Sequence, residues 1–183
     1  MLDNELSNMG MVENAISLLT KFIVKHPTDH SAFRQRALAH LGLEPKNYKL
    51  ALNDINTAIN LSPKDSELYT IKAYIYYELG SFYESGRQNI IAIKLDSKNA
   101  VAMNNLGRAH FSIGENAEAI EWYKFAIKVN PKNPLPYFNI AWTLEHMGNH
   151  ADATKWYEEC LKRSSGSEDF YNTAILRINS LKK

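Results

Sequence analysis

The chain has 183 residues, of which 45% are hydrophobic, and 21 basic against 20 acidic residues leave a formal net charge of +1. This composition is typical of a folded chain, and the charge balance gives no general reason to expect nucleic acid as a partner. No apolar run approaches the roughly 20 residues of a membrane helix, and the N-terminus lacks the features of a secretory signal. We expect a soluble, cytoplasmic protein without membrane insertion, and its single cysteine, Cys160, excludes an internal disulfide.

Residues 1–29 are expected to form a truncated pair of helices. Leu2, Leu6 and Met9 give the first helix a short apolar face, Gly10 marks the turn, and residues 11–25 have apolar side chains at helical spacing. The shortened first helix covers the second one poorly, and an uncovered apolar face favours binding of another segment. We therefore expect this end of the chain to be a contact site.

Residues 30–65 and 66–99 each contain two helical segments joined by a turn. In the first unit, Pro45 disfavours helix at the residue before it, which predicts a loop over residues 43–48. This loop is two residues longer than the corresponding turn of the later units. Residues 62–65, Ser-Pro-Lys-Asp, then give a turn and a helix start.

The second helix of the 66–99 unit is expected to be the loosest of the central helices. Ser85 and Asn89 occupy positions where the other units favour a small or apolar residue. Gly86 adds a helix cost of about 1 kcal/mol relative to alanine.

Residues 100–133 carry the clearest copy of a repeat, and residues 134–167 continue it. Small residues recur where two helices would approach closely, and large residues recur where they would fill the space between helices. The matching positions are Gly107, Gly114, Ala119, Tyr123, Ala126 and Pro131, then Gly148, Ala153, Tyr157 and Cys160 34 positions later, and Ala73, Gly80 and Ala92 34 positions earlier. A fixed period of this length predicts a solenoid, because one helix pair cannot bury its apolar face alone.

Residues 168–183 form the last predicted helix. Tyr171, Ala174, Ile178 and Leu181 share one apolar face, and polar residues lie elsewhere. A terminal helix with a polar outer face is what closes the exposed end of a stack.

The period and its small, aromatic and proline positions resemble the tetratricopeptide-repeat family. The resemblance implies an all-α superhelix, or solenoid, of helix-turn-helix repeats with a C-terminal capping helix. It divides residues 1–183, as one domain, into a truncated repeat at 1–29, full repeats at 30–65, 66–99, 100–133 and 134–167, and a capping helix at 168–183.

No catalytic, cofactor or metal pattern emerges from the sequence. It has no glycine-rich phosphate loop, nucleophile elbow or zinc spacing. His26 and His30, like His146 and His150, are four residues apart, but each pair spans a predicted turn and has no evident third ligand. We therefore predict a protein that is not an enzyme and that needs no cofactor.

The resemblance also implies where a partner would bind, because the first helices of such repeats line the concave surface. The residues that the scaffold does not require there are aromatic, arginine and amide side chains, types enriched at binding hot spots. The implied groove residues are Arg34, Tyr74, Tyr77, Asn104, Asn105, Arg108, Phe111, Phe138, Asn139 and Trp142.

Asn105 and Asn139 occupy the same slot in successive repeats. A carboxamide offers both a donor and an acceptor, so a row of such amides can hold an extended peptide backbone. This is similar to the asparagine ladder in the repeat domain of O-linked N-acetylglucosamine transferase, although Ile71 and Thr173 interrupt it here. The aromatic residues would then form pockets for the peptide's side chains.

Two functions follow from these patterns. The first is a non-catalytic scaffold or adaptor that binds an extended peptide or a partner protein segment in the groove. The second is a structural module that forms homo-oligomers through its truncated N-terminal repeat or an end face. The chaperone-tail clamp of the family is not expected, since its cationic slots hold Thr70, Leu135 and Asn139 rather than lysines and an arginine.

Overall fold

The computed structural model describes residues 2–166 and 169–182, and every regular element in these ranges is an α-helix. The all-α prediction is therefore confirmed. The helices are α1 (Leu2–Lys25), α2 (His30–Leu41), α3 (Tyr48–Leu61), α4 (Ser66–Glu78), α5 (Phe82–Leu95), α6 (Ala100–Ser112), α7 (Asn116–Val129), α8 (Leu135–His146), α9 (His150–Leu161) and α10 (Asp169–Leu181).

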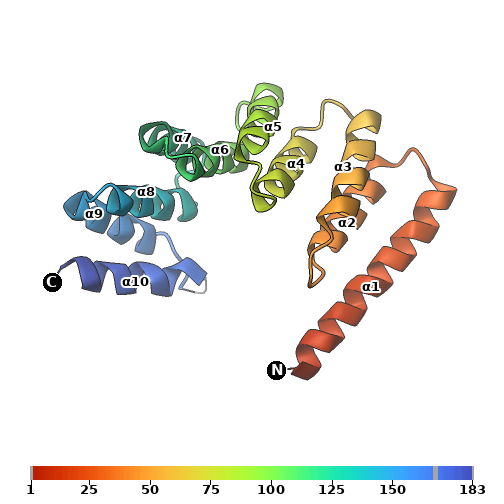
Figure 1. Cartoon of the computed structure of the whole chain (residues 1–183), viewed down its shortest axis with the longest axis horizontal. Helices are drawn as coiled ribbons and strands as arrows, with labels where there is room; N and C mark the ends of the chain where they lie inside the picture. The colour runs from red at the N-terminus through yellow and green to blue at the C-terminus, as the bar shows by residue number, and fades with distance from the viewer. Residues whose placement is uncertain (1, 167–168, 183) are drawn as a thin grey trace.

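The helices pack as antiparallel pairs that follow one another along an arc, as Figure 1 shows. Each pair, α2 with α3, α4 with α5, α6 with α7 and α8 with α9, packs against the next. The first helices also meet one another, because α4 contacts α6, α6 contacts α8, and α8 contacts α10. This is the solenoid that the 34-residue period predicts.

The turns inside the pairs explain why glycine recurs in the period. Gly80, Gly114 and Gly148 have φ values of 74°, 84° and 78°, in the left-handed region that L side chains rarely adopt. Between pairs, the side chains of Asp65 and Asn99 cap α4 and α6 by accepting hydrogen bonds from backbone N–H groups. Sequence and backbone therefore repeat together.

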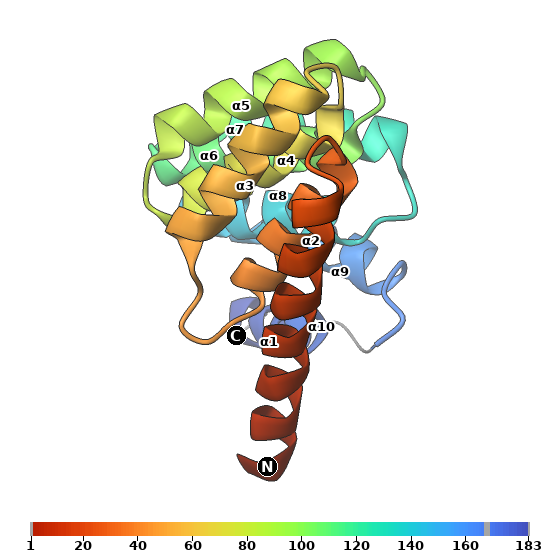
Figure 2. The same cartoon turned by 90° about the vertical axis from the view of Figure 1, so that its right-hand side faces the viewer.

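The N-terminal segment differs from its prediction, because α1 is one continuous helix through Gly10. Figure 2 shows that its N-terminal part projects beyond the rest of the molecule. In the last repeat Asn149 follows the turn glycine and caps the next helix with its side chain, whereas Met11 follows Gly10 and offers no cap. The expected truncated helix pair at residues 1–29 is thus replaced by a single helix.

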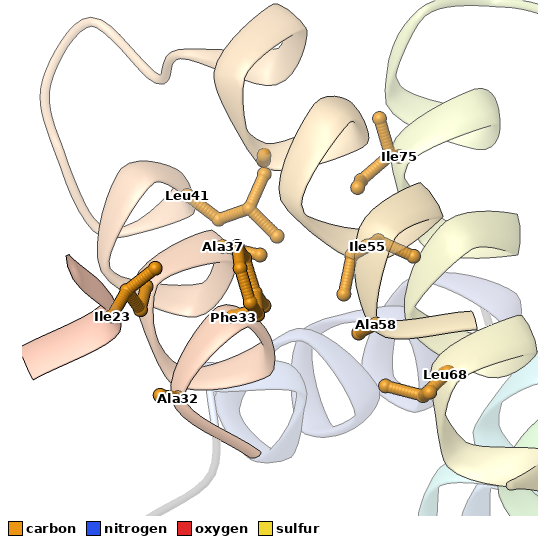
Figure 3. Close-up of a cluster of buried hydrophobic side chains, with 10 residues drawn as sticks. Ile23, Ala32, Phe33, Ala37, Leu41, Ile55, Ala58, Leu68 and Ile75 are labelled. Atoms are coloured by element: carbon orange, nitrogen blue, oxygen red, sulfur yellow. The ribbon is translucent and has the colours of Figure 1, made fainter. Parts of the chain in front are cut away.

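The core of the first repeats is built from small and branched side chains, and Figure 3 shows one such cluster. Ala37 and Ile55 are fully buried between α2 and α3, and Ile23 brings α1 onto this core. The sequence pattern also predicts that Leu61 and Val129 fill the space between helices, and this prediction was wrong. Leu61 and Val129 are more than a third exposed, because both lie in the last turn of their helices.

A buried polar cluster ties α1, α2 and α3 together. Arg36 donates from Nε and Nη2 to the carboxylate of Asp54 at 2.8 and 2.7 Å, and from Nη1 to Thr20 Oγ1 at 3.1 Å. His40 is buried beside this pair, and burial lowers the pKa of its imidazole, so His40 is neutral at pH 7.

Helix α5 contains the buried polar groups that the sequence predicted. Ser85 and Asn89 are 1% and 0% exposed, and the Asn89 amide donates to the Ser85 carbonyl at 3.1 Å. Among the described residues, Ser85 Oγ and Asn89 Oδ1 have no hydrogen-bond partner. Each such group costs about 1–3 kcal/mol, which is a physical reason for weaker packing of α5.

The long loop before α3 contacts the next repeat. Lys46 Nζ lies 3.3 Å from Tyr74 Oη and 3.8 Å from the Glu78 carboxylate, both on α4. Tyr48, the first residue of α3, also donates its hydroxyl to Glu78 at 3.3 Å. The longer loop and the start of α3 therefore bridge neighbouring helix pairs.

Two glycines give opposite predictions for the same substitution. A Cβ on Gly107 would lie 2.5 Å from Tyr123 Cε1 and 3.0 Å from the Ala119 carbonyl oxygen, so Gly107→Ala should lower the free energy of unfolding by about 1–3 kcal/mol. A Cβ on Gly86 would meet only Leu106 Cδ1 at 3.5 Å, so Gly86→Ala should raise it by about 0.5–1 kcal/mol.

Urea unfolding of the two variants measures both effects. Equal midpoints for Gly107→Ala and the wild type would contradict the close approach of α6 and α7.

Candidate functional site

A pocket with a volume of about 270 Å³ opens between the first helices of successive repeats, and we call it the central pocket. Six of the ten predicted groove residues line it together with two residues that the sequence did not indicate. Its lining residues are Tyr77 of α4, Arg108 and Phe111 of α6, Tyr123 of α7, Phe138, Asn139 and Trp142 of α8, and Thr173 of α10.

Contacts at a spacing of 35 residues hold neighbouring first helices in register beside the pocket. Ser112 of α6 donates its hydroxyl to Tyr77 Oη of α4 at 3.0 Å. One repeat later, the Asn139 amide donates to Asn104 Oδ1 at 2.8 Å. These bonds fix the side chains that flank the pocket, so its shape is set before any ligand binds.

A cation and two phenols form one side of the central pocket. The guanidinium of Arg108 lies 4.2 Å from the centroid of the Tyr77 ring, which is a cation–π geometry. Tyr123 is almost fully buried, and burial raises the pKa of its hydroxyl, so this group stays protonated.

Aromatic rings form a second part of the pocket lining. Phe138 and Trp142, one turn apart on α8, are stacked with centroids 6.1 Å apart, and Phe170 of α10 lies 5.5 Å from Phe138. His146 lies edge-on to Phe111 at 5.4 Å and joins α6 to α8. The pocket lining thus combines aromatic faces with one charged group.

The two asparagines of α6 have different environments. Asn104 is only 3% exposed and accepts a hydrogen bond from the Asn139 amide, so Asn104 positions the Asn139 side chain. Asn105 is half-buried and does not line the central pocket. One Asn139 N–H is therefore engaged within the protein, while its carbonyl oxygen is not used in that bond. The ladder of Asn105 and Asn139 stays a prediction.

Two further predicted residues lie on earlier repeats and outside the central pocket. Arg34 of α2 forms an ion pair with Glu67 of α4. Tyr74 of α4 accepts from Lys46 and packs against the first core cluster. Both side chains therefore have partners that join repeats.

Sequence reasoning missed three residues at or near the pocket. Tyr123 was predicted only as a packing residue, and Thr173 only as a break in the ladder. Arg177 of α10 lies 5.0 Å from the Trp142 ring and 3.4 Å from the Glu145 carboxylate. Arg177 follows Trp142 by 35 residues, the spacing that joins the other first helices, so this spacing was the signal for it.

Within the described ranges, no group of three or more histidine, cysteine, aspartate or glutamate side chains is arranged to hold a metal ion. Across the same ranges, each helix is too short or too polar to cross a membrane.

Asn139→Ala should weaken the fold as well as any binding. The substitution leaves Asn104 Oδ1 buried without its donor, which costs about 1–3 kcal/mol. Asn105→Ala is the matched control and should change the free energy of unfolding by no more than about 0.5 kcal/mol. Denaturant midpoints of both variants test this, and indistinguishable midpoints would show that the bond carries no stability.

Comparisons with known proteins point to one repeat family. A family model described as TPR repeat matches residues 107–148, and a second, described as Tetratricopeptide repeat, matches residues 136–166. BBSome complex member BBS4 of Mus musculus is 28% identical over 110 residues, which cover 60% of this chain. The match spans 21% of the length of that protein.

Solved structures share the fold along most of the chain. PilF of Pseudomonas aeruginosa has a TM-score of 0.75 at 18% identity, covering 98% of this chain and 86% of its own. MamA of Desulfovibrio magneticus RS-1 has a TM-score of 0.74 at 15% identity, and the match covers 87% of this chain and 89% of the MamA chain. YrrB, described as a TPR protein with an unusual peptide-binding site, has a TM-score of 0.69 at 16% identity. The match covers 98% of this chain and 88% of the YrrB chain.

Members of this family bind other proteins or peptides and are generally non-catalytic. Two overlapping repeat matches cover residues 107–166, and the helical array continues the same period on both sides, which supports a tetratricopeptide-repeat protein that acts as a protein-interaction scaffold.

Proposed function

We propose that the protein is an adaptor that binds an extended segment of a partner protein in the central pocket and along the first helices beside it. The observation that carries this proposal is the convergence of six residues, predicted from the sequence as groove residues, on a single pocket. They come from three successive repeats, so a segment that touches all of them must run across the helices.

The chemistry of the pocket supports a peptide as its occupant. Phe138 and Trp142 give large apolar contact area at little conformational cost, as aromatic residues do at binding hot spots. Asn139 lines the same pocket and keeps its amide oxygen available for a peptide N–H group. Apolar faces beside a backbone-binding amide suit an extended chain.

Trp142→Ala tests this proposal. Removing the indole should weaken partner binding at least about tenfold, because a buried aromatic anchor is worth 2 kcal/mol or more at a hot spot. The control is Phe125→Ala, which removes a 48% exposed ring from α7, outside the pocket lining. Quantitative pull-down from the native source, followed by titration of the recovered partner, measures the effect.

The proposal predicts a partner that binds the wild type and Phe125→Ala but is lost from Trp142→Ala. A partner retained equally by all three proteins would contradict binding in the central pocket. Thermal melts of the variants separate lost binding from lost folding.

A second function, self-assembly through α1, is favoured by one residue. Phe22 occupies the position that small residues take in every later repeat, and it is 43% exposed whereas those residues are fully buried. The small residues are Ala58, Ala92, Ala126 and Cys160. Leu18, one turn before Phe22, is 67% exposed. This apolar face of α1 lacks the helix that covers its counterparts, and a second copy of the chain could cover it.

Light scattering at two protein concentrations tests self-assembly. If α1 mediates it, the mass of the wild type should rise with concentration, and Phe22→Glu should remain a monomer because a charge cannot be buried without a partner. Phe125→Glu, at a similarly exposed phenylalanine, should behave as the wild type. A wild-type mass that stays monomeric at both concentrations would rule this function out.

A further inference from the structure

We propose that Arg108 anchors a carboxylate of the bound segment, so that the central pocket selects an acidic group next to an aromatic or aliphatic side chain. This inference rests on the proposed function, since it names the chemistry of the ligand at the same pocket. It goes beyond that function because shape and apolar contact alone would not require an anion.

Arg108 differs from every other arginine of the chain. Five of the six arginines form ion pairs in the structure: Arg34 with Glu67, Arg36 with Asp54, Arg87 with Glu84, Arg163 with Glu159, and Arg177 with Glu145. Over the part of the chain that the structure describes, Arg108 has a tyrosine ring as its partner and no carboxylate within ion-pair distance. Its guanidinium donors are therefore left for a ligand.

The surroundings of Arg108 strengthen an interaction with an anion. None of the residues that line the central pocket is acidic. Glu145, which also lies on α8, already pairs with Arg177 and accepts the Tyr157 hydroxyl at 2.9 Å. Glu115, at the start of α7, pairs with His110 at 2.6 Å. A positive charge among aromatic rings, with nearby carboxylates engaged elsewhere, attracts an anion more strongly than one in open water.

The geometry favours a carboxylate over a neutral group. The central carbon of the guanidinium lies 4.2 Å from the centroid of the Tyr77 ring, a contact that holds the fork of N–H donors beside the pocket for a two-oxygen acceptor. Phe111, Phe138 and Trp142 line the same pocket and offer contact to an adjoining apolar group. The carboxylate can come from a glutamate or aspartate side chain or from a free C-terminus, and these two sources share this chemistry.

This site is not the family's chaperone-tail clamp under another name. That clamp takes its cations from slots that hold Thr70, Leu135 and Asn139 in this chain. Here one arginine, held by a tyrosine ring of the preceding repeat, supplies the charge, and aromatic residues supply the remaining contact area.

A pair of small isosteric probes tests the preference for an anion directly. Phenylacetate and phenylacetamide have the same shape and differ in charge. Titration of the isotope-labelled protein, followed by NMR chemical shifts of the Trp142 and Asn139 side chains, should give a dissociation constant about tenfold lower for phenylacetate. The Arg108→Gln variant should bind both probes equally, and the Arg87→Gln control should keep the difference.

Arg108→Lys covers the case in which Arg108→Gln fails to fold. A lysine keeps the charge but loses the planar fork, so the preference for phenylacetate should fall without vanishing. Equal binding of the two probes by the wild type, or binding of neither, would overturn the inference.

Four short peptides then identify the source of the carboxylate. An internal glutamate is tested by Ac-Ser-Phe-Glu-Ser-NH2 against Ac-Ser-Phe-Gln-Ser-NH2, and a chain end by Ac-Ser-Ser-Phe with a free carboxylate against its amide. Tighter binding of one acidic member assigns that source, and no preference in either pair overturns the inference. Failure of these probes leaves the Trp142→Ala pull-down as the independent test of the proposed function.

Discussion

The close approach of paired helices at small residues is the constraint on which the rest of the structure depends. At Gly107 there is no room for even one methyl group, because the Tyr123 ring and the Ala119 carbonyl fill the space. Ala119 and its counterpart Ala153 are fully buried in the same way. Since this contact recurs every 34 residues, each pair has nearly the same geometry, and repetition of one geometry produces an arc rather than a closed bundle (Figure 1).

The arc determines which residues can form a site. Packing uses one face of each first helix, and the neighbouring face meets the next first helix at a spacing of 35 residues, as Tyr77 with Ser112 and Asn104 with Asn139 show. The contacts orient the side chains just outside them, such as Arg108 and Trp142, but these side chains do not take part in the contacts. A solenoid can therefore hold a preorganised pocket while its packing positions keep side chains of similar size from repeat to repeat.

The sequence predicted the all-α solenoid because its signals are local: a period, turn glycines and capping residues. It also predicted six residues of the central pocket, because position within a repeat determines which way a side chain points. It did not separate Asn104, which is buried, from Asn105, which is not, since both suit a polar position beside the groove. The pairing of Arg177 with Glu145 depends on how α10 docks, which no local pattern contains.

The apolar side chains at the two ends of the array are covered to different extents. At the C-terminal end, α10 buries Ala174 and Ile178 against the last pair and also brings Thr173 to the central pocket. The same helix therefore closes the stack and completes the pocket. At the other end, Phe22 fills a position that is small in every later repeat, and its ring is 43% exposed whereas those small residues are fully buried. The N-terminal end of the array thus leaves apolar side chains of α1 exposed, whereas α10 covers those of the last helix pair.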